Sequence, residues 1–444
     1  MRYNVLIENG LLLYPEKTEK KTIGIEGEKL RLLPPGGAYE AERVIDATGC
    51  YILPGLIDPH THPVYVDDLG AISTPALFGG VTTMIHYISI KPGDSPLQVI
   101  HAARENAEAS SHADFAFHAS FFDTLNQLSS IPELAREGIR TFKMFTAYAK
   151  LGWMTGDYAL IKAFDTIAAN GGMACVHAEN GPAIDFLEDK FRPITPDNFP
   201  ATSPGMLDKE AIFRTLLLAK LTECPLYLPH ISSRKGLEAL VLGREEGVRF
   251  WSETCPHYLT FTWDELKERG PLGKLRPPIK TADDRDALWT AVEEAALDTI
   301  GSDHAPKAKT VTDDFESAPY GAPGVETILP VLWELGVNAN RITPFDLVRL
   351  CSEQPAKIFG LFPEKGRLDD GTDADIVIFD PTCKWRIEKA NQHSNAPYTL
   401  YDGFPCRGKI QKVFIRGRLV VDGDRFTGGK AAGKFFETHP GTLM

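Results

Sequence analysis

The hydrophobic pattern changes twice along the chain. Residues 1–53 alternate short apolar runs with turn residues, as in YNVLIENG and KTIGIEGEKL, which predicts strands and no helix. Residues 54–364 show apolar runs that are each followed by an amphipathic segment of helical length. Over residues 365–425 the strand pattern returns, so we expect the two ends to form the halves of one small β-sandwich. The tail, residues 426–444, we expect to be an arm or an oligomer contact.

The central segment contains eight apolar runs that each predict a buried strand. In chain order they are GLIDPHTH, TTMIHY, DFAFHAS, IRTFKMF, MACVHAEN, PLYLPHIS, RFWSETCPH and DTIGSDHAP. Between them lie amphipathic segments such as SPLQVIHAARENAEASS and DYALIKAFDTIAANGG, several of which begin with a Ser or Asp as a predicted cap. Eight strands that alternate with helices indicate a (β/α)8 barrel, of the TIM type. We predict this α/β fold for residues 54–364.

Composition narrows the class of function. The 444 residues are 43% hydrophobic and 24% charged, which is ordinary for a protein with a full core. The formal net charge of −13 argues against nucleic acid or an anionic membrane as a partner, because both favour a basic face. Seven scattered cysteines, never spaced as CxxC, fit reduced thiols and no thiolate zinc site. Since no run of about 18 apolar residues occurs, we expect a soluble cytoplasmic protein that acts on a small molecule.

Polar side chains gather at the predicted carboxyl ends of five barrel strands. They are His60, His62, Lys143, His177, His230 and Asp303. Catalytic residues of such barrels collect at this end, and a spacing of two residues puts His60 and His62 on one face of their strand. A lone pair of this kind is more often structural, but unrelated histidines would have no reason to share one end of a barrel. Four imidazoles and a carboxylate predict zinc or a similar divalent ion, with one position left for water.

Lys143 stands out because it lies inside an apolar strand, between Phe142 and Met144. A buried ammonium without a partner is unfavourable, and beside metal ions it would also be repelled. Taken alone, this lysine would be expected to extend its head to water. Among metal ligands its neutral amine can instead take up carbon dioxide and become a carbamate, an anion whose two oxygens bridge two metals. We predict that carbamate at Lys143.

Six motifs together resemble those of the cyclic amidohydrolases, the group that contains hydantoinase, dihydropyrimidinase, allantoinase and dihydroorotase. In chain order they are PGLIDPHTH, FKMFTAYAK, VHAEN, ETCPHYL, SDHAP and DGTDADIVIFDP. The resemblance covers nearly the whole chain. It implies two divalent metal ions, most simply zinc, and a homo-oligomer (dimer or tetramer). It places the metal ligands on His60, His62, the carboxylated Lys143, His177, His230 and Asp303.

The resemblance also implies a mechanism. A hydroxide that bridges two metals would attack the amide carbon of a ring while the metals polarise its carbonyl. Asp303, besides being a ligand, would take the proton of the hydroxide and pass it to the leaving nitrogen. Tyr148, in the TAY context of FKMFTAYAK, would donate a hydrogen bond to the oxyanion, although a tyrosine after a barrel strand often only packs.

Which ring is opened depends on residues where the chain departs from its relatives. Dihydroorotases carry an arginine that binds the substrate carboxylate at the position of Val64, and allantoinases usually carry an asparagine there, so a hydantoinase or dihydropyrimidinase is favoured. Arg276 replaces a serine, and Tyr320 replaces an asparagine, of the hydantoinase group. Arg276 could bind an acidic substituent or pair with a surface carboxylate. The segment that contains Trp153, with the segment around Val64, would shape an apolar pocket.

Five further positions have weaker predictions. His257 and His304 could orient ligands or substrate, or be ordinary hydrogen-bonded histidines. Asp67, with Asp68 beside it, is predicted on a solvated loop, and Glu179 is expected to brace the site. The competing class of function is a non-catalytic scaffold, which is known among dihydropyrimidinase-like proteins that have lost their metal ligands. The complete ligand set argues against it.

Overall fold

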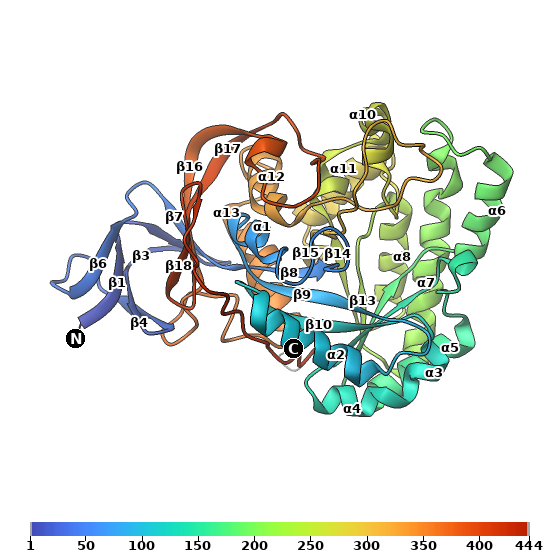
Figure 1. Ribbon diagram of the computed structural model, residues 1–444, viewed down its shortest axis with the longest axis horizontal. Helices are drawn as coiled ribbons and strands as arrows, with labels where there is room; N and C mark the ends of the chain where they lie inside the picture. The colour runs from blue at the N-terminus through green and yellow to red at the C-terminus, as the bar shows by residue number, and fades with distance from the viewer. Residues whose placement is uncertain (1, 442–444) are drawn as a thin grey trace.

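The computed structural model describes residues 2–441 and has two parts, a barrel and a sandwich (Figure 1). The barrel strands are all parallel and lie side by side in chain order. They are β8 (Leu56–Thr61), β9 (Val81–Ile90), β10 (Asp114–Phe121), β11 (Thr141–Phe145), β12 (Met173–His177), β13 (Leu226–Leu228), β14 (Phe250–Thr254) and β15 (Thr299–Ile300). A parallel bridge between Thr61 and His304 brings the last unit back to the first. Each predicted run overlaps one of these strands, so the barrel prediction is confirmed.

Most helices of the structure lie around the outside of the barrel, as Figure 1 shows. The α-helices are α1 (Ser73–Phe78), α2 (Pro96–Ser110), α3 (Thr124–Gln127), α4 (Ile131–Arg136), α5 (Asp157–Ala169), α6 (Gly181–Phe191), α7 (Gly205–Thr222), α8 (Arg234–Glu245), α9 (Pro256–Thr260), α10 (Trp263–Leu266), α11 (Ala282–Glu293), α12 (Ile328–Leu332), α13 (Pro344–Val348) and α14 (Gln354–Phe359). The predicted Ser and Asp caps are only partly right. Ser95 makes no side-chain cap bond, Asp157 lies inside the first turn of α5, and Thr281 caps α11 in a capping box.

The sandwich is built from both ends of the chain, which confirms the prediction from the strand pattern. One sheet has the order β5-β4-β1-β6 and the other the order β19-β18-β17-β16-β7-β2-β3. The strands are β1 (Arg2–Glu8), β2 (Leu11–Leu13), β3 (Thr18–Lys20), β4 (Thr22–Glu26), β5 (Lys29–Leu33), β6 (Glu40–Asp46), β7 (Tyr51–Pro54), β16 (Ile376–Ile387), β17 (Phe404–Ile415), β18 (Arg418–Asp422) and β19 (Arg425–Phe426). Antiparallel pairing of β7 with β16 joins the two ends, and their apolar residues share one core.

The tail returns to the barrel of its own chain. Phe435 forms a parallel bridge with Phe115 at the start of β10, and the Thr438 amide donates to the Gly138 carbonyl. The predicted domain boundaries, including a tail that begins at residue 426, stay predictions. Within residues 2–441 no helix has both the length and the apolar character that crossing a bilayer requires.

A buried charge network joins the barrel to the sandwich at the end of the strands opposite to the polar residues. The Lys365 ammonium lies 2.6 Å from Asp114, 2.9 Å from Asp373 and 2.7 Å from Asp375, and Arg416 also pairs with Asp114. Asp114 begins β10, whereas the other residues come from the sandwich half of the chain. Because an ammonium already lies between the three carboxylates, this acidic cluster is a structural ion network and not a metal site.

We expect Lys365→Met to destabilise the fold by about 3–5 kcal/mol, because it leaves buried carboxylates without their cation. The measurement is the thermal melting temperature of the purified protein. Lys17→Met is the matched control, since Lys17 is half exposed and its ion pair is with surface Glu19. If the Lys365 variant had the same melting temperature as the control, the network would not hold the two parts together.

Candidate active site

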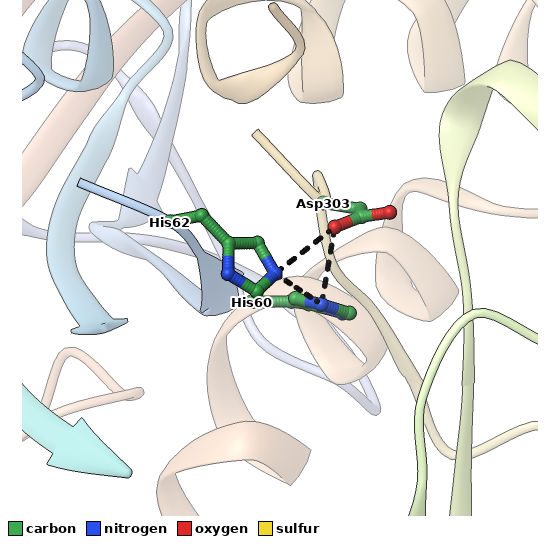
Figure 2. A group of neighbouring side chains, drawn as sticks. All are labelled: His60, His62 and Asp303. Carbon is green, nitrogen blue, oxygen red and sulfur yellow. Dashed lines mark hydrogen bonds and ion pairs between the residues drawn. The ribbon is translucent and has the colours of Figure 1, made fainter. Parts of the chain in front are cut away.

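Three side chains meet where β8 and β15 end at the mouth of the barrel. His60 Nε2 lies 3.2 Å from His62 Nε2, and Asp303 Oδ1 lies 3.2 Å and 3.3 Å from these two atoms (Figure 2). Alternation along β8 turns both histidines to the same face, as predicted. Donor atoms around a tetrahedral ion, at bond lengths of about 2.0–2.1 Å, are separated by about 3.3–3.4 Å. The spacing of the three donors therefore fits a single zinc-like ion.

A buried carboxylate orients His60. Glu253 Oε1, at the end of β14, lies 2.6 Å from His60 Nδ1, and the Tyr227 hydroxyl donates to Glu253 Oε2 at 2.7 Å. Burial alone would lower the pKa of His60, but Glu253 and then Asp303 raise it to about 9. With Nδ1 bonded to Glu253, the ring presents Nε2 to the other donors, which is the arrangement that fixes a metal-binding histidine.

A second pair of histidines lies at the ends of β12 and β13. His177 Nδ1 is 3.0 Å from His230 Nε2, and Glu179 Oε2 is 2.8 Å from His177 Nε2. Ser203 donates to the other oxygen of Glu179 at 2.6 Å. Glu179 thus braces His177 in the way that Glu253 braces His60. The rings of His60 and His230 are 5.2 Å apart, so the two groups of donors are neighbours.

Lys143 lies close to both groups and is only 1% exposed. Its ammonium is 4.6 Å from the centre of the Tyr87 ring, which in turn lies 5.2 Å from the ring of His62. Burial lowers the pKa of Lys143 to about 8. Burial also lowers the pKa values of His62 and His177, and the charge of Lys143 adds to both effects. One side chain therefore acts electrostatically on both donor groups.

The backbone is left-handed at three non-glycine residues around this mouth. The φ angles are 65° at Tyr148, 46° at His230 and 47° at Asp303. Such conformations cost about 1–3 kcal/mol each and are kept only where the surroundings impose them. Here they turn the chain sharply just after β11, β13 and β15, so that the side chains face one another.

The residues predicted to contact the substrate differ in their surroundings and in how exposed they are. Tyr148 lies with its ring 5.1 Å from that of His177, and burial raises the pKa of its phenol well above the usual value, so it remains a hydrogen-bond donor. Arg276 and Tyr320 bond to each other at 2.8 Å. Trp153 packs against Tyr148 at 5.8 Å and is 36% exposed, and Val64 is 48% exposed.

The chain is similar throughout its length to enzymes that open cyclic amides. A model described as "Amidohydrolase family" matches residues 208–420. A D-hydantoinase of Ralstonia pickettii is 33% identical over 98% of both chains. A solved D-hydantoinase is 32% identical with a TM-score of 0.94, over 98% of this chain and 99% of that one. The dihydropyrimidinase of Brevibacillus agri NCHU1002 is 31% identical with a TM-score of 0.94, over 98% of both chains.

The chain belongs to the hydantoinase and dihydropyrimidinase family of cyclic amidohydrolases. Members of this family are hydrolases, and so is this chain. The structure brings together His60, His62 and Asp303, and places His177 beside His230, as the sequence motifs led us to expect. It also adds the acidic residues that orient two of these histidines.

The surroundings of Asp67 differ from expectation, and those of His304 match one of its two predicted alternatives. Asp67 is not solvated: it is fully buried, accepts from Ser394 and the Asn395 amide, and lies 3.0 Å from His304 Nε2. Asp67 lies on a loop as predicted, but the expected exposure to solvent was wrong because a distant segment covers this aspartate. The amides of Gly324 and Val325 donate to His304 Nδ1, so His304 is a hydrogen-bonded histidine that joins loops. Asp68 is exposed, as predicted.

Sequence reasoning missed two acidic residues. Glu253 lies in the quoted run RFWSETCPH, and the signal that singled out Lys143, a charge inside an apolar strand, applies to it equally. Glu188 lies on α6 and bonds to Arg276 at 2.6 Å. No local signal marks Glu188, because a charged residue on an amphipathic helix is ordinarily solvated.

For Glu253→Gln we expect metal affinity to fall roughly 10–100-fold, because the amide no longer holds His60 as an anion does. Competition of the purified protein with a chelator, followed by metal analysis, measures this. Glu246→Gln, an exposed residue that pairs with Lys220, is the control. Equal metal affinity in both variants would mean that Glu253 only packs.

Proposed function

We propose that this amidohydrolase is a binuclear metal-dependent enzyme that opens the amide bond of a neutral five- or six-membered ring of the hydantoin, dihydropyrimidine or cyclic imide type. The observation that carries the proposal is the pairing of two neighbouring donor groups. One consists of His60, His62 and Asp303, and the other of His177 and His230. The similarity to hydantoinases and a dihydropyrimidinase supports the same chemistry.

Lys143 would join the two donor groups as a carbamate formed with carbon dioxide. Its burial, its apolar strand and its position near both groups support this role, because an anion there would balance the charge of two cations. When bound, two divalent ions, for which zinc matches the donors best, supply an acidified water and polarise the amide carbonyl. His60 and His177, each braced by a glutamate, would hold their ions in fixed orientation.

Asp303 and Tyr148 would act on the substrate. The Asp303 carboxylate faces the two β8 histidines, where it can take a proton from the attacking water and return it to the leaving nitrogen. Tyr148 lies beside His177 with a protonated phenol, which suits a hydrogen bond to the oxyanion. Trp153 would supply part of an apolar wall for a ring substituent.

Two other enzyme activities and one non-enzymatic role are the alternatives. Val64 lacks the cation of a dihydroorotase, which supports a neutral ring. It also lacks the amide of an allantoinase, which counts against that activity. A scaffold protein would have no need of braced histidines. We also propose a homo-oligomer, a dimer or tetramer, on the family resemblance, and a cytoplasmic location, which the seven free thiols support.

Steady-state rates on hydantoin, dihydrouracil, allantoin, dihydroorotate and a cyclic imide test the proposal. We expect a hydantoin, dihydrouracil or the cyclic imide to give the highest kcat/KM. Dihydroorotate far ahead of every neutral ring would contradict this assignment. Allantoin far ahead of the other rings would select the allantoinase alternative. A zinc-loaded protein that hydrolyses none of the five would favour the scaffold.

Asp303→Asn should lower kcat by roughly 10²–10⁴-fold or more, because the amide keeps the shape but cannot accept the proton. Much of the metal should stay bound, so activity and metal content are measured on the same preparation. Asp313→Asn removes an exposed carboxylate from the following loop and is the control. Normal turnover by a folded Asp303→Asn enzyme would remove Asp303 from the proton transfer.

A further inference from the structure

Arg276 is a buried cation that lies between the metal-site residues and α6. Its side chain is 4% exposed, and Nη2 donates to Glu188 Oε1 at 2.6 Å and to the Tyr320 hydroxyl at 2.8 Å. The guanidinium also lies over the ring of Tyr320, 4.8 Å from its centre, and 5.6 Å from that of Phe199. Two aromatic faces and one carboxylate therefore hold it in a fixed orientation.

The other terminal nitrogen of Arg276 is buried without a protein partner. Among residues 2–441, no acceptor lies within hydrogen-bond distance of Nη1. A buried N–H donor that stays unpaired is unfavourable, so such an atom in a binding region points to an acceptor on a ligand.

Arg276 is also close to the residues that surround the donor groups. Its guanidinium lies against the ring of Phe199, the first residue of the short turn Phe199–Thr202. Ser203, which follows that turn, donates to Glu179 Oε1 at 2.6 Å. Because Glu179 braces His177 and Tyr148 lies beside that ring, Arg276 borders the region where a substrate would react.

The charge of Arg276 is already balanced. Glu188 forms a charge-assisted hydrogen bond to it, and together the two side chains are neutral. A ligand carboxylate at Nη1 would have to share one cation with Glu188, whereas an uncharged carbonyl oxygen can accept from Nη1 without needing a cation of its own. The pair therefore favours an uncharged acceptor and disfavours a charged one.

We propose that Arg276 is a specificity-determining residue whose Nη1 donates to a carbonyl oxygen of a neutral ring, and that Glu188 sets this preference by excluding rings that carry a carboxylate. The inference rests on the proposed function, since it concerns the substrate of the same site. It gives the serine-to-arginine difference a role other than the binding of an acidic substituent.

Dihydrouracil and dihydroorotate form a matched substrate pair, because they differ by a single ring carboxylate. We expect Glu188→Gln to raise the ratio of kcat/KM for dihydroorotate over dihydrouracil by roughly 10-fold or more, since the guanidinium then carries an unbalanced charge. The double variant Arg276→Met/Glu188→Met removes both charges and should bring the ratio back toward the wild-type value. Asp165→Asn, which removes one exposed carboxylate from α5, controls for net charge and should leave the ratio unchanged.

Arg276→Gln tests the hydrogen bond itself. We expect its loss to raise KM for dihydrouracil by roughly 10–100-fold with a smaller change in kcat, while metal content stays as in the wild type. If Glu188→Gln does not fold, the KM of Arg276→Gln still tests the role of Arg276.

Different results would overturn the role of Arg276 and the proposed function. If wild type hydrolyses dihydrouracil, but the substrate ratio is the same in Glu188→Gln and KM is unchanged in Arg276→Gln, the inference is overturned and the proposed function stands. If wild type prefers dihydroorotate strongly, both are overturned.

Discussion

Buried imidazoles paired with buried carboxylates are the constraint on which the rest of the site depends. His60 with Glu253 and His177 with Glu179 are each held at 2.8 Å or less, in places that water does not reach. Neither partner could be buried alone without a large penalty in free energy. In each pair the carboxylate therefore fixes the orientation of its imidazole ring. The free ring nitrogens then converge on neighbouring positions, with Lys143 close to both.

The same requirement for balanced charge recurs elsewhere in the molecule. At the opposite end of the barrel, Lys365 lies between three carboxylates and joins the sandwich to β10. At the proposed substrate region, Glu188 balances Arg276. The three networks have different consequences: the first joins two parts of the fold, the second leaves one nitrogen available for a ligand, and the histidine pairs present donors that fit metal ions.

Much of this architecture could be predicted from the sequence because it repeats. Eight apolar runs at barrel spacing predicted β8 to β15, and strand patterns at both ends predicted the sandwich. The candidate donors were also visible, since polar residues at the ends of apolar strands are conspicuous. Contacts between distant segments were not predictable: Asp67 is buried by Ser394 and Asn395, more than 300 positions away in the chain. Glu188 belongs to the same class, because only the tertiary fold brings α6 to Arg276.

The most direct measurement is the metal content and activity of Lys143→Ala, with zinc, in the presence and absence of acetate or propionate. If a carbamate at Lys143 bridges two ions, wild type should bind two per chain, and the variant should lose metal and activity together. A short free carboxylate should restore part of both by filling the space, whereas Lys143→Arg should gain nothing, because a guanidinium cannot be carboxylated. A Lys143→Ala protein that keeps two ions per chain and full activity without added carboxylate would contradict the account.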